Sequence, residues 1–300
     1  MKDIKGTTNV CCLIGNPVAH SISPFIHNTL AQLRGDDLVY VPFKVEENRV
    51  EEAVKGAYAL NVLGMNVTVP HKQHVLQALV ETDSIAQAIG AVNTLVRTTK
   101  DGISGYKGYN TDILGLEREL EDVGVSLKDK EIVLLGAGGA ARAIAFLCVQ
   151  KGASQVVILN RTISKANSIA VAVNQYFNQS IVKAMDIKDY DKMALNDYIA
   201  IQTTSVGLHP NNDDVIICDD QFYKNAAAGV DIIYNPSTTK FMKLMHKHGK
   251  PAYNGLKMLL YQGIAAYELW LNCTITKEMA DKVYDVMEKN CFAAFRNEDK

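Results

Sequence analysis

The sequence predicts an α/β protein of two domains with mostly parallel sheets. Short apolar runs alternate with helical stretches along most of the 300 residues, and this alternation is typical of parallel strands that helices cover on both faces. The length suggests about two domains at roughly 150 residues each. The alternation is interrupted near the middle of the chain and restarts at Glu131, which indicates a domain change there.

The first series of elements is expected to form the N-terminal domain. Its predicted strands are VCCLIG (10–15), LVYVPFKV (38–45) and LGMNVTV (63–69). A helical pattern, SPFIHNTLAQL, follows the first of them. The segment 91–109 predicts a β-hairpin with its turn at Lys100–Gly102, and the helix predicted after it covers 112–122.

The second series predicts strands at 131–136, 155–160, 197–204 and 228–234. Two helical stretches near the C-terminus, 255–271 and 275–290, have no strand after them, so we expect them to return and pack on the first domain. The predicted domains are therefore 1–115, completed by 256–300, and 116–255, with a cleft between them.

Charge and cysteine content argue against several classes of protein. A net charge of −2 gives no basic field for nucleic acid or anionic membranes, and no apolar run approaches the ~20 residues of a membrane span. The six cysteines lack metal spacing and lie mostly in apolar runs, which indicates buried thiols in a reducing cytoplasm. We expect a cytoplasmic protein that acts on a small molecule without a metal; monomer and homodimer stay open.

A glycine motif follows the strand predicted at 131–136. LLGAGGAARA places Gly136, Gly138 and Ala141 in a G-x-G-x-x-A pattern. The first glycine permits a tight turn, the second lets backbone approach a pyrophosphate, and the small third residue lets helix pack on strand. Because the motif ends a strand and opens an apolar helix, it predicts a dinucleotide site; the alternative is an ordinary tight turn.

The end of the next strand favours NADP over NAD. An NAD site usually has an acidic residue there for the ribose hydroxyls, but this strand ends in Asn160, Arg161 and Thr162, with Lys165 one turn later. Cations attract a 2′-phosphate, which a carboxylate would repel. Thr162 has an alternative role as the cap of the following helix.

Polar residues also follow the predicted strands of the first domain. Ser21 and Ser23 lie after the first strand, and Thr68 and Lys72 lie at the end of another. Ligands bind beyond the C-terminal ends of parallel strands, so we expect these residues on one rim, where two hydroxyls suit a carboxylate. Ser23 before Pro24 is also a good helix N-cap.

Asn93 and Asp112 flank the hairpin and are expected to reach the same rim. Each has a structural alternative, Asn93 as a turn residue and Asp112 as a charge at a helix start.

Nine segments, in this order, resemble the shikimate dehydrogenase family, which includes shikimate/quinate dehydrogenases. They are HSISPFIHN, NVTVPHK, GAVNTL, GYNTD, GAGGAARA, NRT, TTSVGL, DIIYNP and GLKMLLYQ, and the resemblance covers residues 10–290 approximately. It implies a substrate domain, a Rossmann-type NADP domain, and reversible reduction of 3-dehydroshikimate to shikimate in aromatic amino acid biosynthesis.

The resemblance also implies residue roles. Catalysis falls to Lys72 as acid/base with Asp112. The implied substrate-binding residues are Ser21, Ser23, Thr68, Lys72, Asn93, Asp112, Tyr234 and Gln262. The implied NADP-binding residues are Gly136, Ala137, Gly138, Gly139, Ala140, Asn160, Arg161, Thr162, Lys165, Ile232 and Gly255. Two departures are Lys165, where many NADP-using members have arginine, and Gln202–Thr203, where other small residues are commoner.

Lys72 stands in an unusual place for a lysine. Pro70 is expected to open a helix, and the positive field of a helix start would favour the neutral amine, which suits an acid/base residue more than a solvated lysine. Two other functions stay open: a quinate/shikimate dehydrogenase with relaxed cofactor use, and an inactive dinucleotide-binding regulator. The retained pair of Lys72 and Asp112 argues against the regulator.

Overall fold

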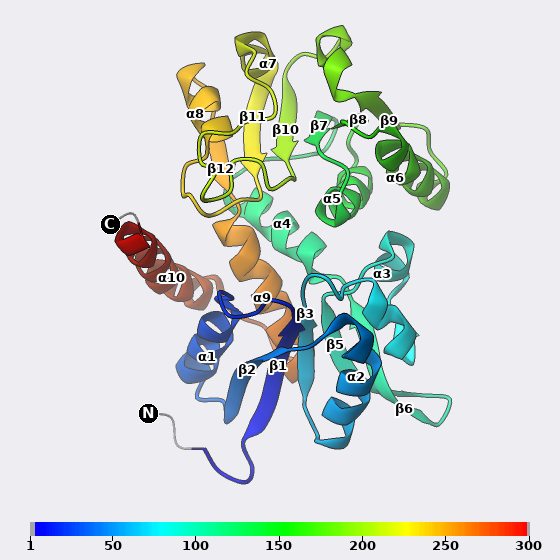
Figure 1. The fold of residues 1–300 in the computed structure, drawn as a ribbon, viewed down its shortest axis with the longest axis vertical. Helices are drawn as coiled ribbons and strands as arrows, with labels where there is room; N and C mark the ends of the chain where they lie inside the picture. Colours follow the sequence, from blue (N-terminus) through cyan, green and yellow to red (C-terminus); the bar gives the residue numbers. More distant parts are fainter. Residues whose placement is uncertain (1–3, 299–300) are drawn as a thin grey trace. The chain divides into compact units, whose positions relative to one another are not determined.

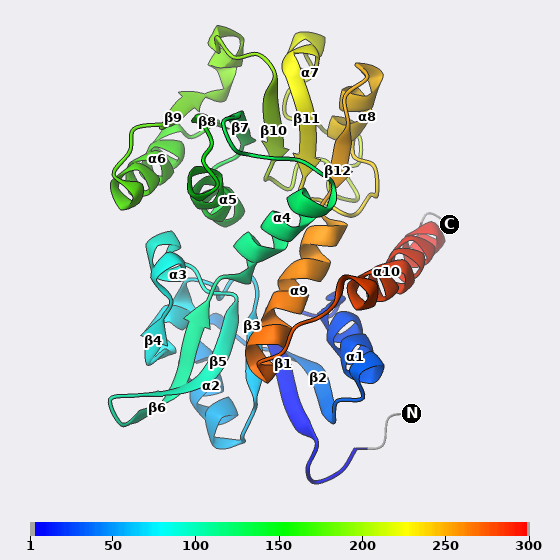
Figure 2. The same ribbon diagram turned by 180° about the vertical axis from the view of Figure 1, so that it is seen from behind.

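The computed structural model describes the backbone of residues 4–298 and the side chains of residues 4–289. The chain divides into two compact units (Figures 1 and 2). Unit 1 comprises Met1–Gly115 and Leu260–Ala293, and unit 2 comprises Leu116–Leu259 and Ala294–Lys300. The predicted α/β class with mostly parallel sheets is confirmed in both units.

Unit 1 contains a six-stranded sheet in the order β2-β1-β3-β5-β6-β4. The strands are β1 (Asn9–Gly15), β2 (Leu38–Lys44), β3 (Gly64–Val67), β4 (Glu81–Thr82), β5 (Thr94–Lys100) and β6 (Ile103–Tyr109). β1 pairs in parallel with β2 and β3, whereas β5 is antiparallel to β3 and β6. The predicted hairpin is therefore confirmed, and its turn lies at Asp101–Gly102.

Helices cover both faces of this sheet (Figures 1 and 2). The helical segments of unit 1 are α1 (Ser23–Arg34), η1 (Glu47–Arg49), α2 (Val50–Ala59), η2 (His74–Ala78), α3 (Ser84–Ile89), the start of α4 (Thr111–Asp122), most of α9 (Leu256–Leu271), and most of α10 (Lys277–Glu298). α2 packs on the face that carries Met65 and Val67. On α9, Trp270 donates to the Leu95 carbonyl at 3.0 Å, and a side chain at Gly64 would collide with its ring.

Unit 2 contains a six-stranded parallel sheet in the order β12-β11-β10-β7-β8-β9. The strands are β7 (Glu131–Leu135), β8 (Gln155–Asn160), β9 (Val182–Asp186), β10 (Tyr198–Gln202), β11 (Ala226–Asp231) and β12 (Ala252–Asn254). The helices are α5 (Gly139–Gln150), α6 (Ile163–Phe177), η3 (Ile187–Lys192), α7 (Asp220–Asn225) and α8 (Lys240–Lys247). This is the doubly wound arrangement that the glycine motif predicts.

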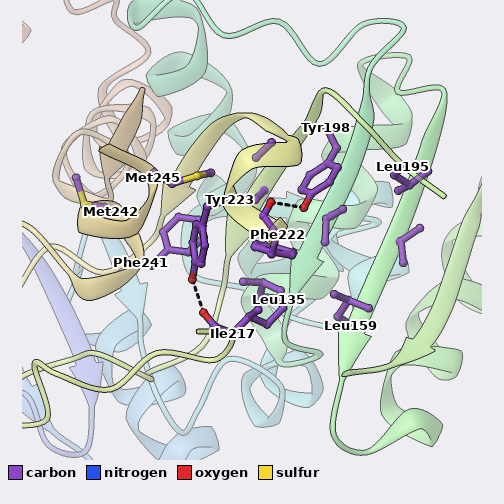
Figure 3. Close-up of a cluster of buried hydrophobic side chains, with 14 residues drawn as sticks. Leu135, Leu159, Leu195, Tyr198, Ile217, Phe222, Tyr223, Phe241, Met242 and Met245 are labelled. Atoms are coloured by element: carbon purple, nitrogen blue, oxygen red, sulfur yellow. Dashed lines mark hydrogen bonds between the residues drawn. The ribbon is translucent and has the colours of Figure 1, made fainter. Parts of the chain in front are cut away.

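The core between α7, α8 and the sheet of unit 2 holds buried tyrosines whose hydroxyls are all paired (Figure 3). Tyr198 donates to the carbonyl of Phe222 and Tyr223 to that of Ile217, each at 2.6 Å. Burial raises the pKa of both phenols. A paired hydroxyl avoids the cost of an unsatisfied buried donor, so these aromatic side chains can fill the core without that penalty.

The cysteines follow the prediction only in part. Cys11, Cys12 and Cys148 are free, buried thiols, but Cys218 is exposed and Cys273 half-buried. The side chain of Cys291 lies outside the described residues. No helix in the described part of the chain is long and apolar enough to cross a membrane.

Candidate active site

One edge of the sheet in unit 1 collects the polar residues that the sequence singled out. β1 and β3 are parallel and end at this edge. β5 runs in the opposite direction and therefore begins there, with Thr94 opposite Asn66, and β6 ends there, with Tyr109 opposite Thr94. The segments 16–22, 68–73, 91–93 and 110–112 consequently meet on one rim.

Lys72, Asn93 and Asp112 form a hydrogen-bonded cluster on this rim. The Lys72 Nζ lies 2.6 Å from Asp112 Oδ2, and Asn93 Nδ2 donates to Asp112 Oδ1 at 2.9 Å. The Lys72 and Asp112 side chains are 30% and 20% exposed, whereas Asn93 is buried. Each carboxylate oxygen thus has its own donor, and the lysine keeps access to a ligand while its charge is neutralised.

The expected helix at Pro70 is wrong. Residues 70–73 form turns, and the short η2 begins only at His74. The reason lies in His71, whose ring is buried against the Val45 carbonyl at 2.7 Å and whose backbone N–H donates to Thr68. The Lys72 carbonyl accepts from Val92. Tertiary contacts, not the first turn of an α-helix, therefore place Lys72 beside its carboxylate partner.

The expected N-cap role of Ser23 is also wrong. The cap position of α1 is Ile22, which makes no side-chain cap bond, and Ser23 already lies inside the helix. The Ser21 hydroxyl accepts from the Ser23 N–H at 3.3 Å. Both serines are half-buried, and the Ser23 side chain hydrogen-bonds to the buried Tyr40.

The serine loop lies beside the segment that carries Thr68. Asn16 donates to the Val69 carbonyl at 3.1 Å, and Thr68 to that of Ile14 at 2.9 Å. A side chain at Gly15 would approach the Thr68 methyl to 2.3 Å. Gln262 lies on α9 of the same unit, and Gly263 beside it packs on α1.

The glycine turn of unit 2 has the geometry of a dinucleotide site. Gly136 has φ +110°, and a side chain there would lie 2.5 Å from the Thr204 methyl, so only glycine fits. Gly138 caps α5, and Gly138 and Gly139 both border open space. Ala141 is fully buried where helix meets strand. The backbone amides at the start of α5 are therefore accessible to a phosphate.

Two exposed cations follow β8. Arg161, Thr162 and Lys165 are exposed, and Asn160 Nδ2 donates to the Thr162 carbonyl at 2.9 Å, which shapes the turn. Thr162 occupies the cap position of α6 but its side chain makes no cap bond, so the capping alternative is wrong. Within the described part of the chain neither cation has an acidic partner, which fits a phosphate ligand.

The segment that carries Ile232 and Tyr234 packs on the strand end that carries Gly255. A side chain at Gly255 would lie 2.2 Å from the Ile232 carbonyl, and the Gly255 N–H donates to Ile233 at 3.0 Å. Tyr234 is half-buried in the same unit. The structure thus brings Ile232 and Gly255 into direct contact.

Gln202 has a structural explanation that the sequence did not provide. Its Nε2 donates to the carbonyls of Thr204 and Val206 and to the buried carboxylate of Asp231. Asp231 also accepts from Thr239 at 2.7 Å, and burial raises its pKa to about 6. Gln202 therefore fixes the loop after β10 and satisfies a carboxyl group that would otherwise be costly to bury.

Three buried polar residues beside the cluster escaped the sequence analysis. Asn66, Thr94 and Thr111 are at most 5% exposed and bond to one another or to Asn93. The sequence carried one signal, because Asn66 is an asparagine inside an apolar strand. A buried asparagine side chain is costly unless its amide is hydrogen-bonded. No group of three or more His, Cys, Asp or Glu that could hold a metal occurs among the described residues.

A glycine-turn dinucleotide fold in one unit and a lysine–carboxylate pair in the other define a nicotinamide-dependent oxidoreductase. Family models agree: "Shikimate dehydrogenase substrate binding domain" matches residues 13–95 and "Shikimate / quinate 5-dehydrogenase" matches residues 118–232. The chain belongs to the shikimate dehydrogenase family.

Individual relatives are similar over nearly their whole length. The shikimate dehydrogenase (NADP+) of Methanobrevibacter smithii is 40% identical over 290 residues, which are 95% of this chain and 97% of the relative. A shikimate dehydrogenase solved with NADP+ is 36% identical with a TM-score of 0.83, covering 94% of this chain and 96% of that one. The Listeria monocytogenes enzyme, solved with shikimate and NAD, is 28% identical with a TM-score of 0.87 and coverages of 96% and 99%.

Proposed function

We propose that this protein catalyses the reversible, NADP-dependent reduction of 3-dehydroshikimate to shikimate. The observation that carries the proposal is the cluster in which Lys72 contacts Asp112 at 2.6 Å and Asn93 contacts it at 2.9 Å. The named activity of relatives at about 40% identity supports it. In this proposal unit 1 binds the substrate and unit 2 binds NADP.

Lys72 acts as the acid/base in the proposed reaction. When bound, the cofactor supplies or accepts the hydride. During reduction, the Lys72 ammonium gives a proton to the forming alkoxide; during oxidation, the neutral amine takes the hydroxyl proton. Asp112 holds the lysine in place and accepts from a substrate hydroxyl, and Asn93 fixes that carboxylate.

The other residues proposed to bind the substrate are the serine-loop and rim residues Ser21, Ser23 and Thr68, Gln262 on α9, and Tyr234 in unit 2. Ser21 and Ser23 donate to its carboxylate, and Thr68, Tyr234 and Gln262 bind its other polar groups. A carboxylate suits the serine loop because both hydroxyls are half-buried donors beside the start of α1.

The residues of unit 2 fit NADP. The pyrophosphate binds at the start of α5, along the turn formed by Gly136, Ala137, Gly138, Gly139 and Ala140. The open space beside Gly138 and Gly139 supports this assignment. The part of NADP that carries the 2′-phosphate is bound by Asn160, Arg161, Thr162 and Lys165. Ile232 and Gly255 border the nicotinamide.

A reducing cytoplasm is the proposed location, since three thiols are free and buried. The protein works there as a monomer or a homodimer.

A four-way turnover assay tests the function. Purified protein is mixed with shikimate or quinate and with NADP+ or NAD+, and reduced nicotinamide is followed by absorbance. We expect the highest kcat/KM for shikimate with NADP+. Comparable turnover of quinate and shikimate with both NAD+ and NADP+ would replace the proposal with a quinate/shikimate dehydrogenase of relaxed cofactor use. No turnover in any mixture would replace it with an inactive dinucleotide-binding regulator.

A further inference from the structure

A chain of buried polar side chains runs through unit 1 and ends at the Lys72–Asp112 pair. It begins at Tyr40 on β2, whose side chain hydrogen-bonds to Ser23 and whose hydroxyl donates to Asn66 Oδ1 at 2.8 Å. Asn66 Nδ2 donates to the Thr94 hydroxyl at 3.1 Å and to the Asn93 carbonyl at 3.2 Å. Tyr40, Asn66 and Thr94 are at most 5% exposed, so the chain is shielded from water until it reaches the rim.

The partners fix the orientation of each amide in this chain. A backbone carbonyl can only accept, so the contact with the Asn93 carbonyl places the Asn66 Nδ2 on that side and its Oδ1 toward Tyr40. At Asn93, the Thr111 N–H can only donate, and it meets Oδ1 at 2.7 Å. The amide nitrogen of Asn93 must therefore face Asp112, where it donates at 2.9 Å.

Thr94 links the two amides. Its hydroxyl accepts from Asn66 and lies 3.1 Å from Asn93 Oδ1, to which it donates. The Thr111 hydroxyl lies 3.0 Å from that of Thr94. Every donor from Tyr40 onward then points toward the Asp112 carboxylate, and hydrogen bonds aligned in one direction polarise one another in a buried site.

We propose that Thr94 is a positioning residue that holds the Asn93 amide, and through it Asp112 and Lys72, in the reactive geometry. Tyr40 and Asn66 anchor Thr94 from the interior of the sheet. This inference rests on the proposed function. Apolar side chains at these buried strand positions would avoid the cost of burying polar groups, so fold stability alone gives little reason for the chain of donors.

Thr94→Val tests the inference because it removes the hydroxyl and keeps the shape. We expect kcat for shikimate oxidation to fall about 10–100-fold, the size of one misplaced polar contact at a reacting centre, with KM for shikimate changed less than about threefold. Thr94→Ser, which restores the hydroxyl, should recover most of the rate. Tyr40→Phe is a second variant should Thr94→Val fail to fold; it should lower kcat without raising the KM for shikimate, whereas loss of its contact with Ser23 alone would raise that KM.

Tyr106→Phe is the matched control. Tyr106 is also a buried tyrosine of this sheet, and its hydroxyl donates to the Val62 carbonyl at 2.7 Å, outside the chain of donors. It should lower the melting temperature and leave kcat within about twofold. A rate loss in Tyr106→Phe as large as in Thr94→Val would overturn the inference, because any lost buried hydroxyl would then slow the enzyme.

The Lys72→Ala background separates this inference from the proposed function. If Thr94 acts through the cluster, Thr94→Val should cost little further rate once Lys72 is gone. A wild-type rate in Thr94→Val, or an equal slowing of Thr94→Ser, overturns the positioning role while Lys72→Ala remains slow. Normal turnover by Lys72→Ala instead overturns the proposed role of Lys72.

Discussion

Replacement of Lys72 should separate chemistry from binding most sharply. An acid/base group acts in the transition state more than in ground-state binding, so Lys72→Ala should lower kcat far more than it raises KM for shikimate. General acid–base groups typically contribute about 10²–10⁴-fold, which is about 3–5 kcal/mol of activation free energy. Lys72→Met keeps much of the length without the charge and should be similarly slow.

The geometry of the pair shows why stability should change much less. At 2.6 Å and an effective dielectric of about 20, the two charges attract by about 6 kcal/mol, but removing them partly from water offsets most of this. After Lys72→Ala, Asp112 keeps the Asn93 amide and meets water at the rim. We therefore expect a melting temperature within a few degrees of wild type.

Lys107 provides a matched control in the same unit. It pairs with Glu81 at 2.9 Å, and the two side chains are 26% and 28% exposed, close to the exposures of Lys72 and Asp112. Lys107→Met should change the melting temperature about as much as Lys72→Met and leave kcat unchanged. This comparison shows whether the loss of any half-buried ion pair is enough to slow the enzyme.

Steady-state rates with shikimate and NADP+, measured across pH, complete the test. The profile of kcat/KM should show a limb for a group that must lose its proton, and Lys72→Ala should lack that limb. Asp112→Asn should also be slow, and the double variant should lose less than the product of the single losses. A near-normal kcat with the same limb in Lys72→Ala would refute the reasoning, since the proton would then leave through another group or water.

Three further perturbations test other parts of the molecule. Arg161→Ala should raise the KM for NADP+ about tenfold or more, with little change for NAD+; equal losses with both cofactors would leave Arg161 only a structural role. Ser21→Ala should weaken shikimate binding by about 1–3 kcal/mol with a nearly unchanged melting temperature. The control Ser126→Ala, which loses an equivalent turn contact at 3.3 Å, should not affect binding. A large fall in the melting temperature of Ser21→Ala with normal shikimate affinity would contradict the binding role. Burial raises the pKa of Glu119 to about 8 despite Lys257, so the free energy of unfolding of the wild type should fall as pH rises from about 5 toward 8. In denaturant titrations, the stability of Glu119→Gln relative to wild type should increase by up to about 1.4 kcal/mol per pH unit over this range. A stability difference that is constant across pH would show that Glu119 does not titrate there.

The apolar strands were predictable because burial on both faces leaves a continuous apolar run. Of the edge strands, β2 was predicted, but β4, β9 and β12 were not. β9 carries Lys183 and Asp186, β4 has two residues, and β12 has three. An edge strand has a neighbour on one side only and needs few apolar residues, so its composition resembles that of a loop.

The hairpin before α4 was predictable from local signals. Asp101 and Gly102 both have positive φ, and this is the backbone that a tight turn between two strands demands. The capping alternatives at Ser23 and Thr162 failed because no side-chain cap bond forms at either helix start.

Gln202 shows the same limit in the site of unit 2. Its sequence neighbours gave no reason for a long polar side chain at the end of a buried strand. The reason is Asp231 on the adjacent strand, 29 positions away, whose carboxylate it contacts at 3.3 Å. Such a pairing depends on which strands become neighbours, and that information is not local.

The stretch NVTVPHK contains the reactive Lys72 together with two buried residues that position it, Asn66 and His71. Met65 and Val67 point into the apolar core under α2, so Asn66 between them points to the opposite face, where Tyr40 and Thr94 meet it. His71 then anchors the turn in the interior, and Lys72 next to it is left half-exposed at the rim. Strand alternation and the buried imidazole of His71 thus place Lys72 without an α-helix. Substitutions at the inward-facing residues should therefore change the position of its ammonium group.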